Sequence, residues 1–213
     1  MESKGLRQYE DVLSVTLAVF ILDILLYSYF VQTSTNNDLF ILIDVIITVI
    51  AAVMGKKLAG AAGFPVWKVS YAAGKSRKSI IVSILIGIGI IGSNTFILCN
   101  YNTDMFSWLS FTNAYQPLFV SLRAALTEET VFRLLIFPGV TWLANKISRS
   151  CTVSIVLGAL ASASAFGLFH NGFYLPFIFG LGLCYIYKKN GLIPAMIIHF
   201  LADFIPFTLI YIK

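Results

Sequence analysis

The protein has 213 residues, of which 58% are hydrophobic and 12% are charged, and its mean hydropathy is +0.86. A soluble domain contains about 45–50% apolar and about 25% charged residues, so this composition excludes a water-soluble globule. The net charge of +5 comes from 15 Lys and Arg against 10 Asp and Glu. Because no nucleic-acid-binding motif accompanies this charge, we expect no nucleic-acid partner.

Seven apolar segments follow one another along the chain, and most are close to the length of about 20 residues that a helix needs to cross a bilayer. The fourth is longer, and we expect a bend in it at Pro138-Gly139. The sequence therefore predicts an all-α, polytopic membrane protein of about seven transmembrane helices. The predicted spans are Val12–Val31, Leu39–Gly55, Ser79–Cys99, Asn113–Asn145, Thr152–Phe169, Gly172–Tyr187 and Leu192–Ile212.

Lys and Arg are concentrated in alternate connections between these spans. They precede the first span and follow the second, fourth and sixth. Since cytoplasmic loops carry an excess of Lys and Arg, this pattern predicts an integral cell-membrane protein with its N-terminus in the cytoplasm and its C-terminus outside. The most basic connection, residues 55–78, should lie on anionic headgroups, so membrane lipid is a predicted partner.

Ionisable residues inside the predicted spans are few. Each costs roughly 2.5–3.5 kcal/mol at mid-bilayer, so each needs a partner or a function. In the outer halves of the spans, Arg123 can form an ion pair with Asp23 or Asp44, and we interpret this pair as structural. The others belong to the last four spans. Glu128, Glu129, Arg133, His199 and Asp203 lie inside them, and His170 lies at the end of one.

The fourth span carries the pattern E-E-x-x-x-R from Glu128 to Arg133. Glu129 and Arg133 are four residues apart with the acid first, which is the favourable order for an ion pair on a helix. Glu128 lies about 100° away round the helix and lacks this partner. A carboxylate without a neutralising cation can exchange protons in a low-dielectric site, so Glu128 is a candidate general base.

The two histidines of the chain lie in two further patterns. F-x-x-x-H ends at His170, and H-x-x-x-D runs from His199 to Asp203, so that each pair shares one helical face. A single membrane histidine typically forms a hydrogen bond between helices. Two histidines together with acidic residues in the last four spans instead indicate one converging polar site.

The depths of these residues in the membrane test this interpretation. Straight spans would place Glu129 and His170 at one level and His199 about 15 Å below them. The gap closes if residues 171–175 are not helical and the sixth span begins at Pro176. Such a break is tolerated at membrane depth only where it lines a cavity or is buried in protein.

The three patterns, in this order over residues 116–207, resemble the CPBP family, which comprises CAAX proteases and the bacteriocin-processing or bacteriocin-immunity proteins also called Abi. The resemblance implies that Glu128 and His170 activate a water for attack on a peptide bond. It further implies that His199 and Asp203 stabilise the oxyanion.

The resemblance also implies that Glu129 and Arg133 are supporting residues that orient the helix. We therefore predict one integral membrane domain over residues 1–213. Three N-terminal spans occupy residues 12–99 of this domain, and the CPBP-like catalytic core occupies residues 113–212.

Asp203 departs from the better-known members of the family, which have Asn at this position. An ionised carboxylate cannot donate a hydrogen bond, so Asp203 is protonated, or orients His199, or leaves the oxyanion to another group. Two histidines with Glu and Asp could also bind zinc. Because the histidines lie on different helices and the resemblance implies metal-independent chemistry, we expect no cofactor and keep zinc as an alternative.

The predicted function is thus that of an intramembrane endopeptidase, a hydrolase of the glutamate type that acts on a peptide or a membrane protein. CAAX-type cleavage, bacteriocin or peptide processing and self-immunity are all compatible with it. A non-proteolytic bacteriocin-immunity or partner-binding protein and a proton-coupled transporter are alternatives. The H-E-x-x-H and G-x-S-x-G patterns of other proteases do not occur in the sequence.

The predicted topology can be tested by labelling single cysteines with a membrane-impermeant maleimide. Substitutions at Asn36, Ser76, Asn102 and Ser148 should report outside, inside, outside and inside, respectively, because the basic connections stay in the cytoplasm. Labelling at Ser76 from the outer face of intact cells would contradict the topology.

Overall fold

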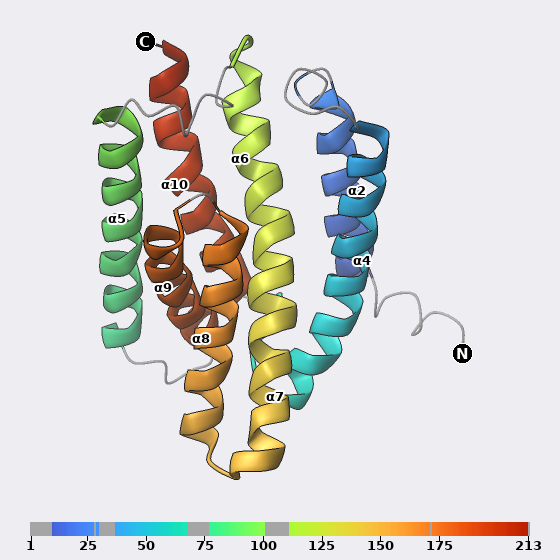
Figure 1. Ribbon diagram of the computed structural model, residues 1–213, viewed down its shortest axis with the longest axis vertical. Coiled ribbons are helices and arrows are strands. Elements are labelled where there is room, and N and C mark those ends of the chain that lie inside the picture. The colour runs from blue at the N-terminus through green and yellow to red at the C-terminus, as the bar shows by residue number, and fades with distance from the viewer. Residues whose placement is uncertain are drawn as a thin grey trace.

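The computed structural model describes residues 10–27, 29, 37–67, 77–100, 111–170 and 172–212. Within these ranges it contains helices and no strands, so the predicted all-α fold is confirmed (Figure 1). The helices are α2 (Glu10–Leu25), α4 (Asn37–Ala61), α5 (Arg77–Asn100), α6 (Tyr115–Glu128), the π-helix η2 (Glu129–Ile136), α7 (Phe137–Ser148), α8 (Cys151–Phe169), α9 (Tyr174–Asn190) and α10 (Leu192–Ile212). Since α6, η2 and α7 form one continuous rod, the described residues make seven rods, one for each predicted span.

The outer surface of the bundle is apolar. Among the described residues, α5, α8 and α10 are each long and apolar enough to cross a membrane. On α5, Ile84, Leu85 and Ile88 are more than half exposed, where a helix facing water would carry polar side chains. These features agree with an integral membrane protein, whereas the direction in which its ends face stays a prediction.

The long central rod departs from α-helical geometry at η2, directly before Pro138, and a bend at Pro138-Gly139 stays a prediction. The Phe137 N–H bonds to the Phe132 carbonyl five residues earlier, and Pro138 has no N–H to continue the ladder. Ser162 of α8 donates a second hydrogen bond, of 2.6 Å, to the Phe132 carbonyl. Pro138 itself lies in the first turn of α7, where a missing N–H is tolerated.

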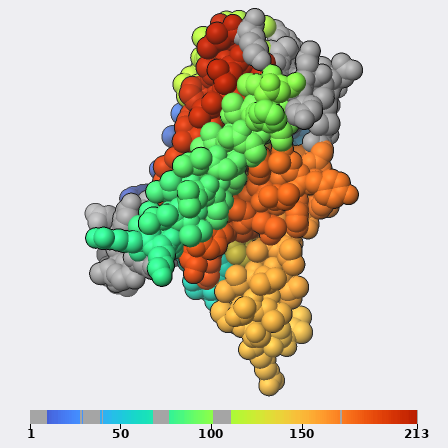
Figure 2. Space-filling model, turned by 90° about the vertical axis from the view of Figure 1, so that its left-hand side faces the viewer, coloured from blue at the N-terminus to red at the C-terminus, as the bar shows by residue number. Residues whose placement is uncertain are grey.

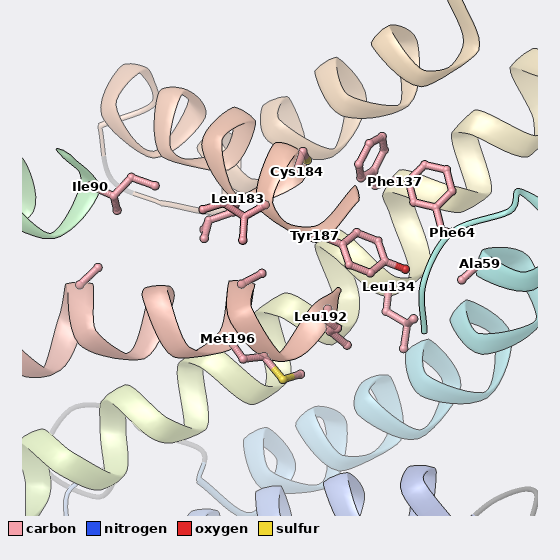
Figure 3. Close-up of a cluster of buried hydrophobic side chains, with 13 residues drawn as sticks. Ala59, Phe64, Ile90, Leu134, Phe137, Leu183, Cys184, Tyr187, Leu192 and Met196 are labelled. Atoms are coloured by element: carbon pink, nitrogen blue, oxygen red, sulfur yellow. The ribbon is translucent and has the colours of Figure 1, made fainter. Parts of the chain in front are cut away.

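A buried aromatic and aliphatic cluster fixes η2 and α7 against the other helices (Figure 3). The Phe64 ring packs edge-to-face on Phe137, with centroids 4.7 Å apart, and also contacts Tyr187 of α9 at 5.7 Å. Leu134 of η2 is fully buried in the same cluster. Phe64, which follows α4, therefore packs against both α7 and α9. The predicted division of the domain into residues 12–99 and 113–212 stays a prediction.

Three positions on α8 and α9 show why small residues are needed there. Ser162 and Ala163 are fully buried, and a Cβ on Gly180 of α9 would lie 3.1 Å from the Ala163 Cβ. The small-residue run Ala161–Ser164 thus packs helix against helix.

The α8–α9 connection breaks the helical backbone beside the polar side chains. His170 is extended and Gly172 has a φ of 94°, a conformation that favours glycine. The break was predicted, but α9 begins at Tyr174 and not at Pro176, which lies in its first turn. Asn171 is outside the described residues. Figure 2 shows the end of α8 and the start of α9 projecting from the side of the molecule.

α10 contains a proline that leaves one carbonyl without its helical donor. Pro206 lies inside the helix, so the carbonyl of Ala202, four residues earlier, receives no N–H from it. The Asn94 amide of α5 donates to this carbonyl at 2.8 Å. α5 is thereby joined to α10 next to the H-x-x-x-D pattern.

Gly55 tests how closely α4 must approach η2. A Cβ at Gly55 would lie 2.7 Å from the Leu134 carbonyl oxygen, whereas one at Gly60 of the same helix meets nothing within 4 Å. We expect Gly55→Ala to lower the free energy of unfolding by about 1–3 kcal/mol through overpacking. Gly60→Ala is the control, and it should be neutral or stabilising. Equal thermal unfolding of the two variants in detergent would contradict this packing.

Candidate active site

Glu128 ends α6, and its carboxylate faces both histidines. Its Oε2 atom lies 3.5 Å from Nε2 of His170 and 3.8 Å from Nε2 of His199. This oxygen is buried and has no hydrogen-bond partner. Three separate segments of the chain, the end of α6, the end of α8 and the middle of α10, therefore meet at one carboxylate, as the prediction of a converging polar site required.

The orientation of His170 is fixed by its own helix. Its Nδ1 lies 2.8 Å from the carbonyl oxygen of Phe166. Since a carbonyl can only accept, Nδ1 carries a proton and donates it. The second nitrogen, Nε2, is the one directed at Glu128, and the side chain is one-third exposed.

His199 is held between carboxylates on both sides of its ring. Nδ1 lies 2.8 Å from Oε1 of Glu129, and Nε2 lies 3.4 Å from Oδ2 of Asp203. The imidazole is buried. The sequence paired Glu129 with Arg133 alone, and its second contact, with His199, was missed. Adjacent helical residues face different neighbours, so the doubled Glu128-Glu129 could have signalled contacts to more than one helix.

The predicted ion pair between Glu129 and Arg133 is confirmed. Nη1 of Arg133 lies 3.2 Å from Oε1 of Glu129, and both side chains are fully buried. The three guanidinium nitrogens make no hydrogen bond. Instead, the guanidinium carbon lies 4.2 Å from the centre of the Phe166 ring, a cation–π contact in surroundings without water.

The Phe166 ring contacts three of the polar side chains at the site. It contacts the His170 ring at 4.4 Å and meets the His199 ring edge-to-face at 5.7 Å, in addition to Arg133. The F-x-x-x-H spacing could have signalled this role, because it places the ring one turn before His170 on the same face.

No three His, Cys, Asp or Glu side chains within the described ranges are arranged to hold a metal ion. Around Nε2 of His199 the carboxylate oxygens lie 3.4–3.8 Å away, which is longer than a normal hydrogen bond. Whether the protein contains zinc stays a question for elemental analysis.

Comparison with known proteins identifies the segment that holds all these residues. The family model described as type II CAAX prenyl endopeptidase Rce1-like matches residues 110–205. No curated protein and no solved structure matches the chain. At the level of the family, the match supports an intramembrane endopeptidase, and it confirms the CPBP resemblance of the three patterns. Residues 110–205 are therefore similar to the Rce1-like family of type II CAAX prenyl endopeptidases.

Proposed function

We propose that the protein is an intramembrane endopeptidase of the glutamate type, in which Glu128 and His170 activate a water molecule. The observation that carries the proposal is the carboxylate oxygen of Glu128, which is buried, makes no hydrogen bond and faces Nε2 of His170 at 3.5 Å. Two polar atoms this close together can both reach one water that lies beside them. A general base must lie within hydrogen-bond reach of the proton that it abstracts, directly or through one water.

The reaction then proceeds by addition and elimination. Glu128 takes one proton from the water while Nε2 of His170 accepts a hydrogen bond from the other, and the water oxygen attacks the peptide carbonyl. The C–O π bond opens to an oxyanion. When the oxyanion collapses, the C–N bond breaks and protonated Glu128 returns its proton to the leaving amine. The products are a carboxylic acid and an amine.

His199 is the proposed donor to the oxyanion. Its Nδ1–H is used by Glu129, so Nε2, which is directed towards the site, is the nitrogen that would donate. We propose that Asp203 orients this N–H and does not itself contact the oxyanion, because an ionised carboxylate cannot donate. Glu129, held by Arg133, fixes the ring from the other side.

The substrate class follows from the family only in outline. The name of the matching family makes a prenylated C-terminal peptide the first substrate to test. A peptide or membrane protein without a prenyl group is the second. Mass spectrometry of membrane proteins and secreted peptides, comparing cells with wild type and with Glu128→Ala, would identify the cleaved bond in either case.

Substitution of the water-activating pair should abolish cleavage. Glu128→Gln and His170→Ala should each lower the rate by about 10²–10⁴-fold, the usual contribution of a general base, and leave a folded, membrane-inserted protein. The rates would be measured on a substrate found by the mass-spectrometric comparison. Full activity of Glu128→Gln would disprove the assignment of the base.

Glu129→Gln is the matched comparison, since it alters the neighbouring carboxylate. It leaves Arg133 buried without its ionic partner, and breaking a buried pair costs about 3–5 kcal/mol. We therefore expect a lower thermal unfolding midpoint for Glu129→Gln than for Glu128→Gln. The reverse order would mean that Glu128 is the structural carboxylate.

Asp203→Asn separates a metal-independent reaction from a zinc reaction. Without a metal, activity should be kept or raised, because the amide still accepts from His199 and can also donate to the oxyanion. If zinc is bound, the same change should weaken metal affinity and activity together. Cleavage rates and elemental analysis of the purified wild type and Asp203→Asn distinguish the two mechanisms. Stoichiometric zinc that is lost in parallel with activity would overturn the glutamate-type proposal.

A further inference from the structure

A second cluster of buried charges lies away from the candidate active site, where α2, α4 and α6 meet. Nε of Arg123 donates to Oδ1 of Asp23, and Nη2 of Arg123 lies 2.6 Å from Oδ2 of Asp44. Asp23 is fully buried, and the side chains of Arg123 and Asp44 are 14% and 12% exposed. The sequence predicted one of these two ion pairs, whereas the single guanidinium binds both carboxyl groups.

The charges in this cluster do not balance if every group is ionised. Two carboxylates and one guanidinium leave one negative charge inside an apolar bundle, where a net charge is costly. The second oxygen of Asp23, Oδ2, is buried and has no hydrogen-bond partner. The cluster thus lacks one positive charge and one hydrogen-bond donor at the same place.

One proton can supply both the missing positive charge and the missing hydrogen-bond donor, because of where the two carboxyl groups lie. Asp23 and Asp44 each bind a nitrogen of the same guanidinium group, so the two carboxyl groups lie side by side at Arg123. Ionised carboxylates can only accept, so two of them in contact repel, whereas a carboxyl and a carboxylate share a hydrogen bond. One proton between Asp23 and Asp44 satisfies the unpartnered oxygen and makes the cluster neutral.

Among the residues that the structure describes, Arg123 of α6 is the cation that forms an ion pair with Asp23 of α2 and Asp44 of α4. Glu128 on α6 instead faces the two histidines.

We propose that Asp23, Asp44 and Arg123 form a buried proton-binding site that holds one proton at neutral pH and joins α2 and α4 to α6 without a net charge. Asp23 and Asp44 lie outside the segment that matches the Rce1-like family, and Arg123 lies inside it. The site does not depend on the proposed protease activity.

A matched control exists between the same two N-terminal helices. Asp11 of α2 binds Lys56 of α4 at 2.7 Å, and these side chains are 32% and 25% exposed. Lys56 donates to both oxygens of Asp11, so this carboxylate has a cation of its own and needs no added proton. Asp11→Asn therefore removes an ionised carboxylate, whereas Asp23→Asn and Asp44→Asn should each remove the shared proton.

The test is infrared difference spectroscopy on the full-length protein, purified in detergent at pH 7. Spectra of wild type minus Asp23→Asn and wild type minus Asp44→Asn should both show the loss of a protonated-carboxyl C=O band, because the remaining aspartate in each variant pairs one-to-one with Arg123. Asp11→Asn should lose carboxylate bands only. If both Asn variants lose carboxylate bands and no protonated-carboxyl band, the proposal is overturned.

Thermal unfolding of the same samples provides a second, independent measurement. Asn has the shape of a protonated Asp and no charge, so we expect the midpoints of Asp23→Asn and Asp44→Asn to stay within about 2 °C of wild type. A cluster that carried a net negative charge would instead be relieved by the substitution. Midpoints clearly above wild type in both variants would therefore also overturn the proposal.

Discussion

The arrangement of the candidate active site depends on the carboxylate of Glu129. One of its oxygens binds both Arg133, on the same rod, and Nδ1 of His199, on α10. These charged side chains are buried and cannot be solvated by water, so their protein partners determine their positions. With Glu129 occupied in this way, the neighbouring carboxylate of Glu128 is left facing the two Nε2 atoms. The different environments of these two adjacent acids thus follow from the number of partners that each one has.

The fold and the identity of the polar residues could be predicted because membrane spans are long apolar segments in which any charge is conspicuous. The pairing of Arg133 with Glu129 followed from helical spacing. The π-helix could not be predicted, because it combines the missing N–H of Pro138 with a hydrogen bond from the distant Ser162. The second partner of Arg123 also depends on three helices meeting in space, which no spacing in the sequence encodes.

Several contacts to the segment that matches the family come from helices outside it. Gly55 of α4 permits close contact with the backbone of η2, and Asn94 of α5 binds the carbonyl that Pro206 leaves free on α10. Asp23 adds a contact from α2. The N-terminal helices therefore form part of the environment of the family segment, and a polypeptide limited to residues 110–205 would expose these buried polar groups to lipid.

The break between α8 and α9 places the two histidines on different kinds of backbone. His199 lies within a continuous helix, whereas His170 lies on extended backbone before Gly172. An insertion or deletion in this connection would move one imidazole and leave the central rod in place. In evolutionary terms, connections tolerate such changes better than packed helices do. The connection is thus the part of the site in which related sequences can diverge in reactivity at the smallest cost to the fold.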